Sequence, residues 1–304
     1  MKPAVLVLGG GPDREREISL DSARAVGEAL RAHGGYQVHE HTIDRLTVDE
    51  LAALPAGAVF PVLHGVWGEG GPLQDLLADS GRAYVGCRPG PARCAMDKVA
   101  AKLAAARCGV PTQPAALVSV CDPVCPLPLP VVVKPVHEGS SVGLHLCHSE
   151  HDWRRAHDEA SSDPARAYLV ERLIGANGQR RELAVGVFEG RALPAIEIAP
   201  AEGVYDYAAK YTRGDTRYTP RPELPEGLAE RLSDWAVSLA EAIGASSISR
   251  VDFMLDETGR PWFLEINTMP GFTGSSLFPM AAQAEGIEMP ALCARLAASA
   301  QAGR

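Results

Sequence analysis

The chain has 304 residues, a length that corresponds to two or three domains. Hydrophobic residues make up 46% and charged residues 22%, the usual balance of a globular protein. The formal net charge of −9 at pH 7 disfavours binding to a polyanion, so no nucleic-acid partner is expected. The apolar runs are too short to cross a bilayer or to form a signal peptide, so we expect a cytoplasmic protein without a membrane partner.

Strand and helix alternate over the first 90 residues. Apolar runs at residues 4–8 and 58–63 predict buried strands, and further strands are expected at 36–41 and 83–86. Helices are expected at about 19–32 and 72–79, with a short one opened by a capping box at Thr47 and Glu50. This alternation predicts a doubly wound parallel sheet. Such a sheet binds ligands at the carboxyl ends of its strands, here residues 9–17 and the Gly-rich loop expected at 64–71.

The rest of the chain predicts a mixture of strands and few helices. One helix is expected at 97–108 and one long helix at about 226–243, and Ser149 is expected to cap another. The predicted strands lie at residues 131–134, 143–147, 168–171, 182–188, 192–199, 248–255 and 261–267.

Residues 248–267 predict a β-hairpin, because two apolar runs flank a turn that contains glycine. With the turn centred just before that glycine, Asp252 faces Glu265 and Arg250 faces Asn267 across the pair. Two carboxylates and an amide on one face make an oxygen-only site suited to Mg²⁺ and substrate phosphates. An ion-paired, solvent-exposed face is the alternative. The opposite face is expected to carry Val251, Phe253, Leu255, Leu264 and Ile266.

A second candidate site follows the strand that ends at Lys134. The segment Glu138-Gly-Ser-Ser-Val-Gly143 offers many backbone N–H groups beside this lysine, an arrangement suited to phosphate. Glycine and serine between two strands also form ordinary hairpin loops, so this alternative stays open.

Taken together, these and further motifs resemble the D-alanine–D-alanine ligases of the ATP-grasp superfamily. The resemblance covers nearly the whole chain, and the motifs follow in the order of that family. They are Glu15-Arg-Glu17-Ile-Ser-Leu20, His64-Gly with Gly68-Glu and Gly71-x-Leu73-Gln74, Met96-Asp-Lys98, Lys134-Pro with Glu138–Gly143, Tyr205-Asp-Tyr with Lys210-Tyr211, Arg250-x-Asp252, Glu265-x-Asn267 with Pro270-Gly271, and Ser275-Ser276-Leu277.

The resemblance implies a fold of mixed α/β and α+β class. An N-terminal doubly wound domain on the first-substrate side is expected at residues 1–88. A two-subdomain ATP-grasp fold is expected to follow, with a central subdomain at 89–170 and a C-terminal subdomain at 171–304 that carries the metal site and a lid. ATP would lie between the last two, and a homodimer is the implied assembly.

The resemblance also implies the residues that hold the two amino acids. Glu17 would bind the ammonium group of the first D-alanine, with His64 close by, and Ser140 and Tyr211 would hydrogen-bond with that Glu to close the lid. The tetrahedral oxyanion would be stabilised by Arg250 and the N–H of Gly271, and the second carboxylate would be bound by Ser276 and the N–H of Leu277.

ATP and metal ligands are implied in the same way. Lysines would contact the phosphates, acidic side chains the adenine and ribose, and the hairpin two Mg²⁺ ions, for which Mn²⁺ could substitute. The residues are Lys98, Lys134 and Lys210 for the phosphates, Glu171 and the backbone near Ile174 for adenine, Glu182 for ribose, and Asp252, Glu265 and Asn267 for metal.

The implied activity is ATP-dependent condensation of two D-alanines through an acyl phosphate, for peptidoglycan synthesis. The alternative is a related ligase that joins other amino acids or a hydroxy acid in antibiotic synthesis or resistance. The chain departs from the family at Gly68-Glu-Gly-Gly71-Pro72, where Gly-Glu-Asp-Gly-Thr is usual, and at Pro91-Ala-Arg93, where small residues are usual. The segment between Glu171 and Glu182 is about four residues longer than in the family.

Overall fold

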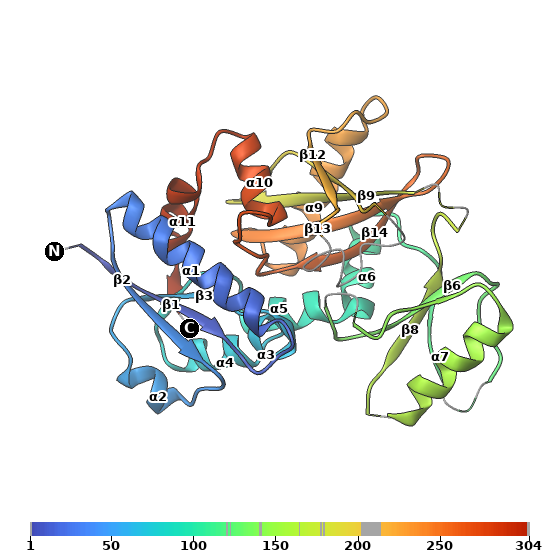
Figure 1. The fold of residues 1–304 in the computed structure, drawn as a ribbon, viewed down its shortest axis with the longest axis horizontal. Helices are drawn as coiled ribbons and strands as arrows, with labels where there is room; N and C mark the ends of the chain where they lie inside the picture. Colours follow the sequence, from blue (N-terminus) through green and yellow to red (C-terminus); the bar gives the residue numbers. More distant parts are fainter. Residues whose placement is uncertain are drawn as a thin grey trace.

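The computed structural model describes residues 2–119, 121, 123–139, 142–163, 165–176, 178, 180–201 and 214–302. These residues form three sheets. Figure 1 shows the N-terminal sheet in blue on the left, the sheet of the last third of the chain in yellow and orange in the middle, and the sheet of the central part of the chain in green on the right. A parallel sheet followed by antiparallel sheets confirms the predicted fold class. Within the described ranges, no helix combines the length and apolarity needed to cross a bilayer.

The N-terminal sheet is parallel apart from one short strand contributed by the end of the described chain. Its strands lie in the order β15 (Gln301–Ala302), β4 (Ala83–Tyr84), β3 (Ala58–Pro61), β1 (Ala4–Gly10) and β2 (Gln37–Ile43), with β15 antiparallel to β4. The helices are α1 (Arg16–His33), α2 (Val48–Ala53), α3 (Gly65–Glu69) and α4 (Pro72–Asp79). The predicted capping box at Thr47 opens α2, and α1 ends at Gly34 in the left-handed conformation.

The prediction of a Gly-rich loop at residues 64–71 is wrong in part, because α3 occupies Gly65–Glu69. The carboxylate of Asp13, from the loop after β1, accepts hydrogen bonds from Trp67 N at 2.9 Å and Gly68 N at 3.3 Å. This capping group comes from more than 50 residues away along the chain. The local sequence therefore carries no sign of the helix.

The central sheet is antiparallel and small. Its strands lie in the order β5 (Ala115–Leu117), β8 (Tyr168–Arg172), β6 (Val131–Pro135) and β7 (His145–Cys147). Ser149 caps α7 (Glu150–Ser162), as predicted, and Trp153 of this helix packs into the core beneath the sheet. The boundary predicted between the central and C-terminal subdomains, at residues 170 and 171, falls inside β8.

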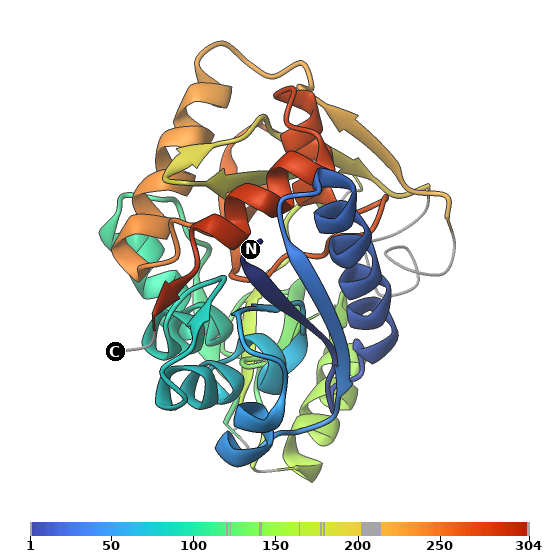
Figure 2. The same ribbon diagram turned by 90° about the vertical axis from the view of Figure 1, so that its left-hand side faces the viewer.

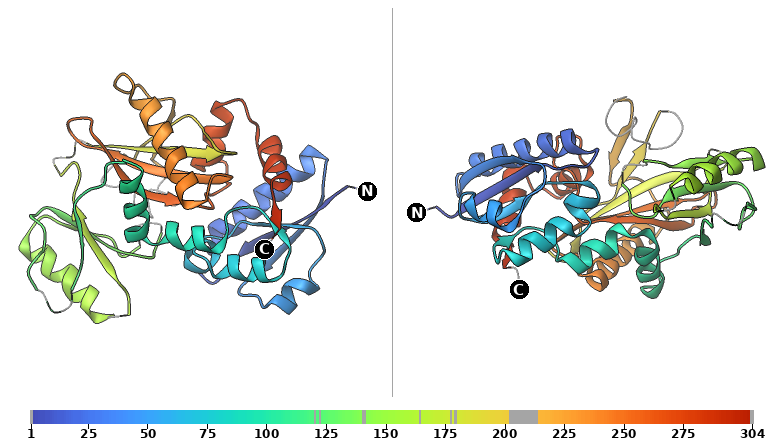
Figure 3. Two further views of the ribbon diagram at one scale, coloured as in Figure 1. Left: turned by 180° about the vertical axis from the view of Figure 1, so that it is seen from behind. Right: turned by 90° about the horizontal axis from the view of Figure 1, so that it is seen from below.

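The third sheet carries helices on both faces. Its strands are β12 (Arg217–Pro220), β11 (Ile196–Ala199), β9 (Arg181–Phe188), β13 (Ile248–Leu255) and β14 (Pro261–Asn267), with β10 (Arg191–Ala192) also on β9. One face packs on α5 (Pro89–Met96), α6 (Lys98–Arg107) and α9 (Leu228–Ile243), which are seen from behind in Figure 3. The other face packs on α10 (Leu277–Ala284) and joins the core of the N-terminal domain. In Figure 2, α11 (Met289–Ala298) lies beside α1.

Several expected elements differ from the structure. The strand predicted at 192–199 is divided into β10 and β11, because Pro194 has no N–H to donate to a ladder. The expectation of one long helix near the C-terminus missed α10 and α11. Helices of eight to ten residues give a weak periodic signal and depend on tertiary packing for their stability. The first part of the predicted central subdomain, α5 and α6, packs on the third sheet.

The hairpin register is confirmed, since Asp252 pairs with Glu265 and Arg250 with Asn267. The expected position of Leu264 on the core face is wrong. The register shifts between Asp252 and Phe253, so that Phe263 joins the core and Leu264 lines a cavity on the opposite face. A bulge of this kind inserts one residue into a strand and reverses the facing of the residues beyond it.

The close approach of α1 to β1 should depend on Gly9. A Cβ at this position would lie 2.6 Å from Cβ of Ala23 in α1. Gly9→Ala should therefore lower the free energy of unfolding by about 1–3 kcal/mol through overpacking. Gly90→Ala is the control, because no heavy atom lies within 4 Å of its Cβ position and alanine favours α5. Urea unfolding of both variants measures the difference, and equal midpoints would contradict this account of the β1–α1 contact.

Candidate active site

Two cavities meet where the three sheets come together. The first, of about 320 Å³, lies between the N-terminal domain and the β13–β14 hairpin. The second, of about 140 Å³, lies between the central and third sheets. Lys98, Glu138 and Glu265 line both cavities. A ligand in one cavity therefore lies next to a ligand in the other.

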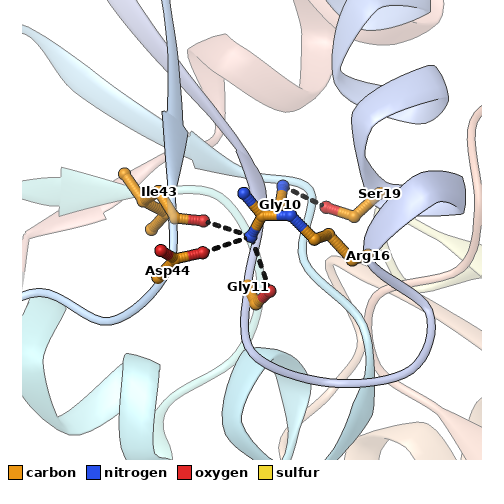
Figure 4. A network of polar contacts seen from close by, with 6 residues as sticks. All are labelled: Gly10, Gly11, Arg16, Ser19, Ile43 and Asp44. Carbon is orange, nitrogen blue, oxygen red and sulfur yellow. Dashed lines mark hydrogen bonds and ion pairs between the residues drawn. The ribbon is translucent and has the colours of Figure 1, made fainter.

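The first cavity contains Glu15, which stands at the beginning of α1 and is only 7% exposed. The loop before it is held by Arg16, as Figure 4 shows. Nη1 of Arg16 donates to the carbonyls of Gly11 at 2.8 Å and Ile43 at 3.1 Å, and to Asp44 Oδ1 at 2.5 Å. One guanidinium thus ties together the carboxyl ends of β1 and β2 and fixes the position of Glu15.

The prediction that Glu17 lies at the first-substrate site is wrong. Glu17 is exposed in the first turn of α1 and does not line the first cavity. Two residues along a helix correspond to a rotation of about 200°, so Glu15 and Glu17 point in different directions. The sequence motif contains both acids, and only the position of the helix start distinguishes them.

His64 and Glu69 stand buried at the wall of the first cavity. Burial lowers the pKa of His64 to about 4, so this ring is neutral near pH 7. Burial and the neighbouring Glu15 raise the pKa of Glu69 to about 8. Glu69 Oε1 accepts from Gly65 N at 3.2 Å, whereas its Oε2 has no hydrogen-bond partner among the described residues. Sequence reasoning missed Glu69, although it lies within the quoted motif.

The hairpin supplies the opposite wall. Arg250 forms a bidentate ion pair with Asp252, with both N···O distances at 2.8 Å. Glu265 and Asn267 line the first cavity, and Asp252 lies behind Arg250, buried at 4% exposure. The carboxylate and amide groups lie on one sheet face, as the register requires.

The loop before α10 completes the first cavity. Gly271, Ser276 and Leu277 all line it, and Leu277 is the first residue of α10. A Cβ at Gly271 would lie 2.8 Å from Ser276 Oγ, so any side chain at Gly271 would displace that hydroxyl. Ser276 Oγ accepts from Thr273 N at 2.9 Å. A helix N-terminus with unpaired N–H groups is suited to a carboxylate.

The second cavity combines charged residues with apolar walls. Its walls include Val132 and Leu146 from the central sheet, Leu144 just before β7, and Met254 and Leu264 from the third sheet. A flat apolar ring fits between such walls. Its charged residues include the predicted ATP ligands Lys98, Lys134, Glu171 and Glu182, and Ile174 lies beside them.

Glu171 is the most buried of these charged groups, at 1% exposure. Its carboxylate lies 2.5 Å from Nζ of Lys102 and 2.5 Å from Nζ of Lys134. Burial alone would raise the pKa of Glu171, but the two ammonium groups outweigh it and hold this pKa below its ordinary value. Sequence reasoning missed Lys102, which lies one helical turn after Lys98 in α6.

The structure thus brings together the described site residues that the resemblance implied, with the exception of Glu17. Ser140, Lys210 and Tyr211, which were expected to form and close the lid, lie outside the described residues.

Comparison with known proteins identifies the family. Residues 116–298 match the family model for the C-terminus of D-Ala–D-Ala ligases. The chain is 38% identical over 300 residues to the D-alanine–D-alanine ligase of Anaeromyxobacter dehalogenans, covering 96% of this chain and 95% of the relative. It is 42% identical over 301 residues to that of Acidiphilium cryptum, covering 95% and 96%.

The chain belongs to the D-alanine–D-alanine ligase family. The solved structure of the Bacillus anthracis ligase complexed with ATP matches with a TM-score of 0.83 at 26% identity, covering 98% of this chain and 97% of that one. D-alanyl-alanine synthetase A from Vibrio cholerae matches with a TM-score of 0.84 at 25% identity, covering 98% of both chains.

Two of the three segments that depart from the ligase family's usual motifs lie beside each other, and they meet at Gly71, which itself matches the usual pattern. Gly71 has φ +119°, and a Cβ there would lie 2.6 Å from Cγ of Arg93. The Arg93 guanidinium in turn forms an ion pair with Asp75 of α4, with Nη1 3.1 Å from Oδ1. The arginine thus covers the glycine, so one packing arrangement links the two unusual segments.

Stability should depend on the protonation of Glu69. Its pKa is about 8 in the folded protein against an ordinary value of 4.5, so the folded state binds the extra proton between these values. The contribution of this proton to the free energy of unfolding is complete below pH 4.5 and is lost as the pH rises through 8. Glu69→Gln stays neutral, so the free energy of unfolding of the variant should rise relative to that of the unsubstituted protein from about pH 5 to about pH 9.

Urea unfolding across this pH range measures the effect. Glu17→Gln is the control, because it removes one carboxylate from an exposed position on α1. A constant stability difference between Glu69→Gln and the unsubstituted protein would show that Glu69 is ionised throughout.

Proposed function

We propose that this protein condenses two D-alanines into D-alanyl-D-alanine at the expense of ATP, for peptidoglycan synthesis. The observation that carries the proposal is the junction of the two cavities at Lys98, Glu138 and Glu265. A carboxylate bound in the first cavity would meet the terminal phosphate of a nucleotide bound in the second. That contact is what formation of an acyl phosphate requires.

The first cavity suits both amino acids. Glu15 would bind the ammonium group of the first D-alanine, with the neutral His64 beside it. Ser276 and the N–H of Leu277 would bind the carboxylate of the second D-alanine at the start of α10. The acyl phosphate would be attacked by the second amine, and Arg250 with the Gly271 N–H would stabilise the resulting oxyanion.

The second cavity suits ATP. Adenine would lie between the apolar walls, with Glu171 and the backbone near Ile174 at its edge and Glu182 at the ribose. Lys98 and Lys134 would neutralise phosphate charge, which is the main requirement of phosphoryl transfer. The roles of Lys210 at the γ-phosphate, and of Ser140 and Tyr211 in closing a lid, remain part of the proposal.

The donor set at the junction fits Mg²⁺. Asp252 and Glu265 face each other across the hairpin, and Asn267 follows on the same face, so the ligands are all oxygen atoms. Bound there, two Mg²⁺ ions would add positive charge beside the phosphates, and Mn²⁺ could substitute. Arg250 pairs with Asp252 in the structure. The carboxylate of Asp252 would then be shared between Arg250 and a metal ion.

A homodimer and a cytoplasmic location, where ATP is available, complete the proposal. Sedimentation of the purified chain tests the assembly, since a single species of monomer mass would reject it. Fractionation of cells tests the location.

The deciding experiment is phosphate release from ATP across a panel of D- and L-amino acids and D-hydroxy acids. D-alanine alone should give both phosphate and dipeptide. Comparable turnover with a D-hydroxy acid acceptor, with a flat profile between about pH 6 and pH 9, would favour the alternative ligase, because a hydroxyl acceptor has no ammonium group to deprotonate.

Glu15→Gln should raise the KM for the first D-alanine by about tenfold or more, because it removes the charge that pairs with the ammonium group. The KM for ATP should change little, since Glu15 does not line the second cavity. Glu17→Gln is the matched control on the same helix and should leave both constants unchanged. Steady-state kinetics with varied D-alanine measure the KM for the first D-alanine. A larger effect of Glu17→Gln than of Glu15→Gln would assign the ammonium group to Glu17 instead.

Glu265→Gln should raise the Mg²⁺ concentration needed for half-maximal activity and lower kcat, because the amide is a weaker ligand than a carboxylate. Titration of phosphate release with Mg²⁺ measures both effects. Glu257→Gln, in the turn of the same hairpin, is the control. Unchanged activity of Glu265→Gln at limiting Mg²⁺ would reject the metal assignment.

A further inference from the structure

Lysine is rare in this chain. Of its 29 basic residues, 24 are arginine and five are lysine: Lys2, Lys98, Lys102, Lys134 and Lys210. Arginine is thus the ordinary cation here, and lysine differs from it in carrying a compact ammonium. Lys2 is exposed, and three others are the proposed phosphate ligands. Lys102 is the remaining lysine, and it has no role in the proposed reaction.

Lys102 lies beneath the second cavity. It is 8% exposed, lines neither cavity, and has its Nζ 2.5 Å from Oε1 of Glu171. The other carboxylate oxygen lies 2.5 Å from Nζ of Lys134, which does line the second cavity. Glu171 therefore stands between a lysine that faces the nucleotide site and one that does not.

The proposed reaction requires the Glu171–Lys134 pair to open. Lys134 must turn to the phosphates, and Glu171 must present a free lone pair to adenine. A buried carboxylate that loses its only partner is strongly destabilised, because removing one member of a buried ion pair leaves an uncompensated charge. Glu171 has almost no contact with solvent that could replace Lys134.

We propose that Lys102 is a positioning residue, the permanent counter-ion of Glu171, which allows Lys134 to leave Glu171 for ATP. This inference rests on the proposed ATP-dependent function. Lys102 keeps the carboxylate compensated and oriented while Lys134 moves between two partners. The compact ammonium suits this buried place, because the guanidinium fork of arginine is larger.

The test is a double-mutant cycle on ATP affinity, measured by calorimetric titration with Mg²⁺. Lys134→Met should weaken ATP binding by about thirtyfold in the unsubstituted protein. In Lys102→Met, Lys134 is retained by Glu171 and contributes little, so adding Lys134→Met should weaken binding by about threefold or less. A residue that merely supports the fold would give equal losses in both backgrounds, and that result would overturn the proposal.

Arg107→Met is the matched control, because it removes an exposed cation from the last turn of the same helix. It should leave ATP affinity unchanged and should not alter the effect of Lys134→Met. Coupling of equal size with Arg107→Met would assign the effect to overall charge and contradict a specific role of Lys102.

A second cycle applies if Lys102→Met does not fold. Glu171→Gln removes the charge that Lys102 compensates, so Lys102→Met added to Glu171→Gln should fold and should change ATP affinity by less than about twofold. A tenfold or larger further loss would overturn the proposal. Absence of ATP binding by the unsubstituted protein would instead reject the proposed function, whereas ATP binding and dipeptide formation without coupling would reject the role of Lys102 alone.

Discussion

The antiparallel pairing of β13 with β14 is the constraint on which both cavities depend. It places Arg250 and Asp252 on one strand opposite Asn267 and Glu265 on the other, so that cation, carboxylates and amide share one face. The same pairing buries Val251 and Phe253 on the opposite face, under α9. A slip of one residue would exchange these two faces, so the apolar packing under the sheet also maintains the chemistry above it.

Charge compensation is the second organising feature. Acidic groups gather around the junction of the cavities, and three of the buried ones differ in how their charge is compensated. Asp252 has a bidentate arginine, Glu171 has two lysines, and Glu69 has a raised pKa because burial and Glu15 disfavour its ionised form. The two lysines thus favour the ionised form of Glu171, whereas burial favours the protonated form of Glu69 beside the first cavity.

Loops position the remaining groups through contacts between distant segments. Arg16 ties the ends of β1 and β2 together, and Asp13, from the loop after β1, caps α3. Arg93 covers Gly71 and pairs with Asp75, which joins two of the segments that depart from the ligase family's usual pattern.

The sequence by itself determined the parallel N-terminal sheet and the hairpin register, because alternation of apolar side chains is a local property. The order of motifs likewise pointed to many of the residues that line the two cavities. Only the tertiary structure decided that Glu15 rather than Glu17 faces the cavity, because the start of α1 depends on the loop held by Arg16. The bulge that turns Leu264 to the cavity, the helix α3 capped by Asp13, and the contact of Lys102 with Glu171 were likewise settled by groups far apart in the chain. Such contacts produce no periodic pattern in the amino-acid sequence. Their energy comes from packing and charge between segments that meet only after folding.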